Sequence, residues 1–88
     1  MVIWKTVLKG TDVQIVEIPQ GAEILCAREQ NGNICMWYRC DPAAAKIEHK
    51  VAIVGTGSWA PEDGRYIGTA FLHNGSLVFH VFVAPTAS

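Results

Sequence analysis

A loop of small residues, Gly55-Thr56-Gly57-Ser58, is the first pattern in this chain that could do chemistry. Backbone N–H groups in such a run can converge on an anion, and the two hydroxyl groups add donors. Arg65 closes the same loop and could hold a phosphate or carboxylate through two parallel hydrogen bonds, while Trp59 offers a ring for stacking. The loop is not a dinucleotide fingerprint, because a third glycine is missing and Pro61 discourages the helix that should follow. The glycines would serve tight turns equally well, and both interpretations stay open.

His80 is the second candidate, and we expect it to lie opposite Thr69 in a hairpin. Because an unperturbed imidazole titrates near neutral pH, His80 could contact a ligand or move a proton. A buried neutral imidazole that is hydrogen-bonded to the Thr69 hydroxyl is an adequate structural role for the same pair. The predicted ligand-binding set is Gly55, Thr56, Gly57, Ser58, Trp59, Arg65, Thr69 and His80.

The other reactive residue types form no recognisable catalytic or metal-binding pattern. Cys26, Cys35 and Cys40 are an odd number without C-x-x-C spacing, and zinc needs three or four convergent ligands. A hairpin closed at Asn31-Gly32 makes Cys26 and Cys35 diagonal neighbours, which is a poor geometry for a disulfide. We therefore expect reduced thiols, no metal, no cofactor and no catalytic residue. A small enzyme that uses His80 or a cysteine is the alternative.

The hairpin predicted over residues 66–83 positions Thr69 and His80. Asn74-Gly75 lies between two apolar runs, and the two central positions of a type I′ turn need φ > 0, which Asn and Gly adopt readily. One face then carries the opposed pairs Leu72–Leu77, Ala70–Phe79, Gly68–Val81 and Tyr66–Val83. The other face carries Phe71, Val78, Ile67 and Phe82 around the Thr69–His80 pair. Since a one-layer sheet should have a polar face, we expect a second sheet or a second copy of the chain to cover this one.

The rest of the chain indicates strands joined by turns. We predict them over residues 2–8, 13–18, 23–30, 33–40 and 47–54. No stretch sustains a 3.6-residue apolar period, and turn signals recur every eight to twelve residues or so, as in sandwiches and barrels. The sequence therefore predicts an all-β fold with a single domain over residues 1–88. We expect one small β-sandwich or barrel of about 6–7 antiparallel strands built from hairpins.

Composition narrows the possible functions. Half of the 88 residues are hydrophobic and 17% are charged, against about 25% charged in typical globular chains. Self-association through the 66–83 hairpin is the simplest way to bury this apolar excess, and a compact monomer rich in Val and Ala is the alternative. Seven scattered Lys and Arg residues argue against nucleic-acid binding. Neither a membrane span nor a signal peptide is recognisable, so we expect a cytoplasmic protein.

Six segments of the chain form a recognisable set: Ile3-Trp4-Lys5, Ile18-Pro19-x-Gly21-Ala22-x-Ile24-Leu25, Trp37 with Asp41-Pro42, Val54-Gly55-Thr56-Gly57, Arg65-Tyr66-Ile67-Gly68-Thr69 and Leu77-Val78-Phe79-His80-Val81-Phe82. Together they resemble a family of small proteins of unknown function that is associated with phages, prophages and mobile DNA. The resemblance covers nearly the whole chain and implies an intracellular accessory protein. It brings no activity and no catalytic residue.

The leading hypothesis from the sequence is a non-enzymatic, homo-oligomeric β-domain that binds a host protein or a small anionic ligand. Pockets between subunits suit such a chain, because one core of 88 residues has little room for a cavity. The alternatives are the small enzyme and a structural part of a virion or scaffold. Open-ended assembly without a small-molecule pocket would favour the structural role.

Overall fold

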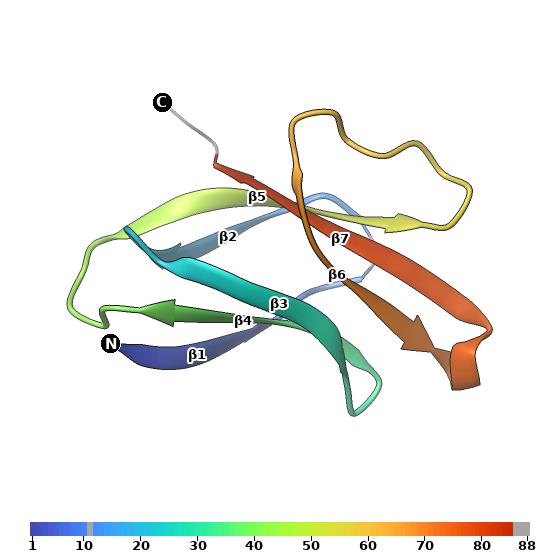
Figure 1. The fold of residues 1–88 in the computed structure, drawn as a ribbon, viewed down its shortest axis with the longest axis horizontal. Coiled ribbons are helices and arrows are strands. Elements are labelled where there is room, and N and C mark those ends of the chain that lie inside the picture. Colours follow the sequence, from blue (N-terminus) through green and yellow to red (C-terminus); the bar gives the residue numbers. More distant parts are fainter. Residues whose placement is uncertain (11, 86–88) are drawn as a thin grey trace.

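The computed structural model describes residues 1–10 and 12–85 and consists of two antiparallel β-sheets (Figure 1). The strands are β1 (Val2–Val7), β2 (Gln14–Pro19), β3 (Glu23–Gln30), β4 (Asn33–Cys40), β5 (Lys46–Gly55), β6 (Arg65–Leu72) and β7 (Leu77–Pro85), with a 3₁₀ turn, η1 (His73–Gly75), before β7. One sheet has the order β1-β4-β3 and the other β2-β5-β7-β6. The predicted all-β sandwich is confirmed. Thr11 and residues 86–88 of the predicted domain lie outside the described residues.

The core lies between the two sheets. Because successive side chains of a strand point to opposite faces, each strand contributes alternate residues to it. The three-stranded sheet contributes Ala27, Ile34, Met36, Tyr38 and Cys40, and the four-stranded sheet contributes Val16, Ile18, Val51, Ile53, Ile67, Ala70, Val81 and Val83. Among the described residues, the buried side chains are apolar or aromatic, together with cysteines and Pro19, and none is polar or charged. Hydrophobic burial is therefore the main force that holds the sheets together.

Both Asn-Gly dipeptides adopt the turns that the sequence predicts. The φ angles are 53° and 82° at Asn31-Gly32, and 57° and 89° at Asn74-Gly75. At the second turn the backbone N–H of Ser76 donates to the carbonyl oxygen of His73 over 3.1 Å. A two-residue loop joins β3 to β4, whereas four residues, His73 to Ser76, join β6 to β7, and His73 also has a positive φ of 51°. Both turns keep the predicted register in the strands next to them.

The β6–β7 hairpin keeps the predicted pairing from its turn as far as Gly68. A β-bulge between Tyr66 and Gly68 then shifts the register, so that Tyr66 lies opposite Phe82. The predicted pairing of Tyr66 with Val83 is wrong, because a bulge places two residues opposite one and turns the next side chain to the other face. Ile67 is consequently buried, and Tyr66 is exposed on the outer face of the sheet.

The two sheets meet where β3 and β6 lie side by side, which we call the β3–β6 seam. A Cβ atom on Gly68 would lie 2.2 Å from the carbonyl oxygen of Ala27, so only glycine allows the two backbones to approach this closely. At the start of the seam, Arg65 Nη2 donates to the carbonyl oxygen of Ile24 over 3.0 Å. The sandwich is thus closed along this side, while β1 and β2 are edge strands.

Loop 56–64 packs on the outer face of the four-stranded sheet. Lys50 Nζ lies 3.3 Å from Asp63 Oδ2, and a Cβ atom on Gly64 would lie 2.8 Å from Cβ of Phe82. The predicted second apolar face of the hairpin is therefore covered in part by the chain's own loop. Tyr66 and Phe71 stay exposed on that face.

Candidate functional site

Four side chains form a line of hydrogen bonds across the outer face of the four-stranded sheet. His80, on β7, has Nε2 2.8 Å from Thr56 Oγ1, just beyond β5, and Nδ1 3.1 Å from Thr69 Oγ1 on β6. The Thr69 oxygen also lies 2.5 Å from the hydroxyl of Tyr66. The predicted pairing of Thr69 with His80 is confirmed. Neither the contact of Thr56 with His80 nor the place of Tyr66 in this line was predicted.

The line of hydrogen bonds holds the imidazole of His80 in one orientation. A neutral imidazole has one donor and one acceptor nitrogen, so one threonine hydroxyl accepts from the ring and the other donates to it. Thr69 has a single hydroxyl proton, so it can donate to His80 or to Tyr66 but not to both. The tautomer of His80 is therefore coupled to the direction of the hydrogen bond between Thr69 and Tyr66. His80 and Thr69 are half-buried, so the bond between them is partly shielded from water, whereas the bonds to the exposed Thr56 and Tyr66 are open to solvent. The arrangement makes this patch of the surface rigid.

The Gly55–Ser58 loop forms a β-turn that follows β5. The N–H of Ser58 donates to the carbonyl oxygen of Gly55 over 3.0 Å, and Gly57 has the positive φ, 96°, that glycine adopts without strain. The N–H of Thr56 donates to the carbonyl oxygen of Val78 over 3.2 Å. Two of the N–H groups that an anion would use are therefore bonded within the chain.

The remaining predicted site residues lie apart from His80. The Arg65 guanidinium donates to the carbonyl oxygen of Ile24 on the β3–β6 seam. Trp59 is 97% exposed on loop 56–64. The structure thus brings together Thr56, Thr69 and His80 from the predicted set, and it places Arg65 and Trp59 elsewhere.

A groove along the β3–β6 seam adjoins the line of hydrogen bonds and was not predicted. It has a volume of about 460 Å³ and is lined by Leu25, Cys26, Ala27, Arg28, Tyr66, Ile67, Gly68, Thr69 and Phe71. Tyr66 and Thr69 belong both to this groove, which we call the β3–β6 groove, and to the line of hydrogen bonds. Tyr66 is 55% exposed and Phe71 is 59% exposed. The apolar outer-face position of Phe71 was the one sequence signal for this site.

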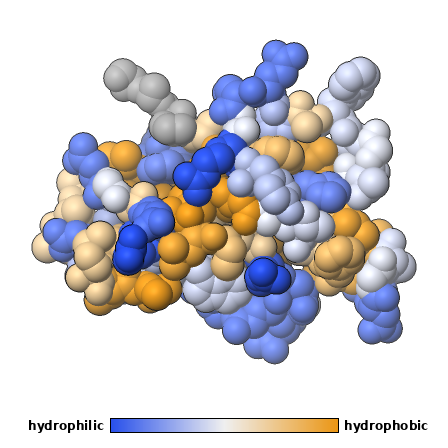
Figure 2. Space-filling view, viewed as in Figure 1, coloured by the Kyte–Doolittle hydropathy of each residue, from blue (hydrophilic) through white to orange (hydrophobic). Residues whose placement is uncertain are grey.

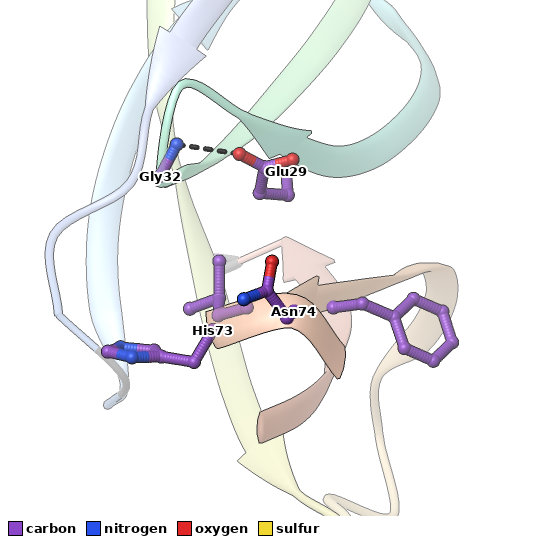
Figure 3. Close-up of a pocket in the computed structure, with 6 residues that line it drawn as sticks. Glu29, Gly32, His73 and Asn74 are labelled. Carbon is purple, nitrogen blue, oxygen red and sulfur yellow. Dashed lines mark hydrogen bonds between the residues drawn. The ribbon is translucent and has the colours of Figure 1, made fainter. Parts of the chain in front are cut away.

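A second hollow of about 440 Å³ continues along the same seam, between the two Asn-Gly turns. It is lined by Glu29, Gly32, Phe71, Leu72, His73 and Asn74. In Figure 3 the Asn74 side chain points toward the β3–β4 turn, where Glu29 Oε2 accepts the N–H of Gly32 over 2.6 Å. Phe71 lines both hollows, so they lie next to each other along β3 and β6.

Comparison with known proteins identifies a family for the chain. The model of a family described as a domain of unknown function, DUF7352, matches residues 1–88. The chain belongs to the DUF7352 family. The expected membership of a family of uncharacterised small proteins is thus confirmed, and no curated protein and no solved structure matches the chain.

The DUF7352 chain has three free thiols. Cys35 and Cys40 are buried, whereas Cys26 is half-buried and lines the β3–β6 groove. Within residues 1–10 and 12–85, no group of three or more His, Cys, Asp or Glu side chains is placed to hold a metal ion. The described part of the chain also contains no helix that is long and apolar enough to cross a membrane.

The line of hydrogen bonds in this DUF7352 domain can be tested through Thr69. We expect Thr69→Val to lower the free energy of unfolding by about 1 kcal/mol, because it leaves the half-buried imidazole of His80 and the Tyr66 hydroxyl without a shared partner. The measurement is urea unfolding, repeated in a Tyr66→Phe, His80→Ala background. An equal loss in that background would show that the coupling between these residues is absent.

Proposed function

We propose that the protein is a non-enzymatic binding domain whose β3–β6 groove accepts an extended segment of a partner protein. The observation that carries the proposal is the exposure of two aromatic side chains, Tyr66 and Phe71, on one wall of an elongated groove. Aromatic side chains are enriched in the cores of protein interfaces, where each adds a large apolar contact area. Exposed aromatic rings lower the solubility of a chain with so few charges. Their exposure beside a groove therefore favours a binding role.

The floor and dimensions of the groove suit a bound segment. The close approach of Gly68 to Ala27 fixes the two walls relative to each other, so the groove would lose little conformational entropy on binding. The volume of about 460 Å³ falls in the ordinary range for binding pockets. The second hollow adjoins Phe71 further along the strands, and only an extended segment could contact both hollows.

The residues of the groove also indicate the chemistry of the partner. Tyr66 and Phe71 would pack against an apolar side chain, and the guanidinium of Arg28 in the opposite wall would pair with a carboxylate. We therefore expect a segment in which an apolar residue lies near Asp or Glu. If the chain is an accessory protein of phages or mobile DNA, as the resemblance in its sequence implies, that partner would be a host protein.

A small anionic ligand is less well supported than a protein segment. The N–H groups of Thr56 and Ser58 are bonded to carbonyl oxygens, and Arg65 donates to Ile24 on a different part of the surface. The anion cradle expected from the sequence would therefore need the loop to rearrange. Binding in the β3–β6 groove requires no such change.

An acyl-transfer enzyme is the second candidate, because Thr56 Oγ1 lies within hydrogen-bonding distance of His80 Nε2, as a nucleophile lies to its base. We place it second because Nδ1 of His80 is bonded to the Thr69 hydroxyl rather than to a carboxylate, and the N–H of Thr56 is already bonded. Hydrolysis of p-nitrophenyl acetate faster than free imidazole achieves, and lost in both Thr56→Val and His80→Ala, would reverse this order.

The binding proposal is tested by comparing two exposed aromatic side chains. The protein is purified gently from the cells that express it, a co-purifying partner is isolated, and its affinity is measured for wild type, Phe71→Ala and Trp59→Ala. We expect Phe71→Ala to weaken binding at least about tenfold, since truncating a central aromatic anchor typically costs more than about 1.4 kcal/mol. Trp59→Ala, outside the groove, should leave affinity unchanged.

The opposite pattern would refute the groove as the binding site. If a partner binds Phe71→Ala as tightly as wild type, its contact lies elsewhere. Native mass spectrometry of the same preparation adds an independent readout. A bound small mass that survives Phe71→Ala and is lost in Arg65→Ala would favour the anionic ligand instead.

A further inference from the structure

β1 is an edge strand without the usual protection against pairing with another chain. Within the described residues, it pairs with β4 on one side and with no strand on the other. Natural edge strands are blunted by proline, by bulges or by charged side chains. β1 contains no proline, and its pairing with β4 has no bulge. Its one charged residue, Lys5, leans away from the edge across β4, because Nζ donates to Gln30 Oε1 on β3 over 2.7 Å.

β1 also exposes apolar side chains on both of its faces. Ile3 is 62% exposed and Val7 is 49% exposed on the outer face, and Val2 and Trp4 are exposed on the other face. Figure 2 shows hydrophobic atoms gathered at the lower left of the molecule, over β1. Covering these side chains would gain roughly 25 cal/mol per Å² of apolar area removed from water.

The other strand edges are less open. β3 and β6 cover each other along the seam, through the contact of Gly68 with Ala27. β2 ends in Pro19, which has no N–H, and the Gln14 amide at its other end is bonded to the backbone of Lys9 over 2.8 and 2.9 Å. β1 is therefore the edge best suited to receive another strand.

The backbone of β1 determines which of its groups face outward. Leu8, directly after β1, donates its N–H to the carbonyl oxygen of Ile34 over 2.9 Å and continues the register with β4. Since N–H and C=O groups alternate in direction along a strand, the outward groups belong to Ile3, Lys5 and Val7. A two-fold axis perpendicular to the sheet leaves the same face of both copies on the same side. The outward groups of one copy then bond to the outward groups of the other, so odd residues pair with odd residues.

We propose that two copies of this chain pair antiparallel through β1, with Trp4 on the two-fold axis. Ile3 of each copy then lies opposite Lys5 of the other, and each such pair exchanges two backbone hydrogen bonds. The next possible register would put Lys5 opposite Lys5, which like charges disfavour. The two Trp4 side chains meet in a non-hydrogen-bonded pair, where Cα atoms lie about 4.5 Å apart. The paired three-stranded sheets become one six-stranded sheet.

This proposal does not depend on the β3–β6 groove, because β1 and β3 lie at opposite edges of the same sheet. Both grooves of the dimer would stay open. A dimer would therefore present two binding sites, and a partner with two copies of the recognised segment would gain avidity.

The test measures solution mass by light scattering for wild type, Lys5→Pro and Lys5→Thr. We expect wild type to have about twice the 9.6 kDa mass of one chain. Lys5→Pro removes an outward N–H without touching the β4 ladder, so we expect a folded monomer with an unchanged circular dichroism spectrum. Lys5→Thr keeps the N–H and should remain a dimer. A monomeric wild type, or a dimer that survives Lys5→Pro, would overturn the proposal.

A cross-link keeps the proposal testable if Lys5→Pro fails to fold. In a Cys26→Ser background, Trp4→Cys should give a reductant-sensitive dimer on mild oxidation, because a non-hydrogen-bonded pair has disulfide geometry. Lys5→Cys should give little cross-linked dimer, since Lys5 lies opposite Ile3 of the second copy. Cross-linking at Lys5 but not at Trp4 would refute the register. A dimer that dissociates in Phe71→Asp and not in Lys5→Pro would instead place the contact on β6, as the sequence-based expectation has it.

Discussion

Replacing Gly68 by alanine should lower the free energy of unfolding by about 3 kcal/mol or more, at the upper end of overpacking effects. The added Cβ would lie 2.2 Å from the carbonyl oxygen and 2.9 Å from the nitrogen of Ala27. Both atoms belong to the backbone of β3, so relief requires the two sheets to separate along the seam. Urea unfolding followed by circular dichroism measures the loss of unfolding free energy. The separation of the sheets should also widen or abolish the β3–β6 groove.

Gly55→Ala is the matched control for this substitution. A Cβ atom on Gly55 would lie 3.7 Å from Cε1 of Phe79, which is an ordinary van der Waals contact. The new methyl group also reduces the conformational freedom of the unfolded chain. We expect a change within about 1 kcal/mol in either direction. Equal stabilities for Gly55→Ala and Gly68→Ala would mean that β3 and β6 are not held in contact.

Ile18→Ala should have the second large effect, a loss of about 3 kcal/mol in the free energy of unfolding. Ile18 is 0% exposed on β2 and faces the three-stranded sheet as part of the core. Truncation removes buried methyl and methylene groups and leaves a cavity that the rigid strands around it fill only in part. Since the whole free energy of unfolding of a native domain is about 5–15 kcal/mol, such a loss removes a large fraction of it.

Ile15, three residues earlier on the same strand, provides the comparison. It is 53% exposed on the outer face, so Ile15→Ala should cost less than about 1 kcal/mol in unfolding free energy. Both variants carry the same Ile→Ala substitution on the same strand. The difference between their unfolding free energies, measured by chemical denaturation, therefore contains no contribution from β-strand propensity. A similar loss at both positions would show that the outer face of β2 is covered in solution.

The hairpins illustrate what short-range pattern alone can predict. Asn31-Gly32 and Asn74-Gly75 were predicted as turns from the conformational freedom of those two residue types, and both have positive φ. A two-residue turn determines which residues face each other next to it, so the pairing of Thr69 with His80 followed directly. These predictions succeed because each depends on a few neighbouring residues.

The bulges illustrate what the pattern could not predict. Tyr66 was expected on the inner face and is on the outer face, because one extra residue enters β6 before Gly68. A similar shift in β3 lies between Ile24 and Cys26. Whether a strand takes up an extra residue depends on the surface it packs against, here the other sheet. Alternation within the strand carries no information about that surface.

The candidate site divides in the same way. His80 and Thr69 were predicted together because they belong to one hairpin. Arg65 was grouped with the loop at Gly55–Ser58 because it follows that loop in sequence, yet its guanidinium lies on the β3–β6 seam, bonded to Ile24. A long side chain at the start of a strand can reach several neighbours, and sequence proximity does not select among them.

The sequence by itself determined the strands, the turns and the all-β class of this protein, because alternation and positive-φ residues act over a few positions. Only the tertiary structure decided that β3 and β6 pack together, with Gly68 against Ala27 forty-one positions away. That contact creates the groove and places Arg65 at the seam, while the strand order β1-β4-β3 leaves β1 as an edge strand. It depends on how two sheets fit against each other, and such a fit is settled by the shapes of surfaces that distant segments build jointly.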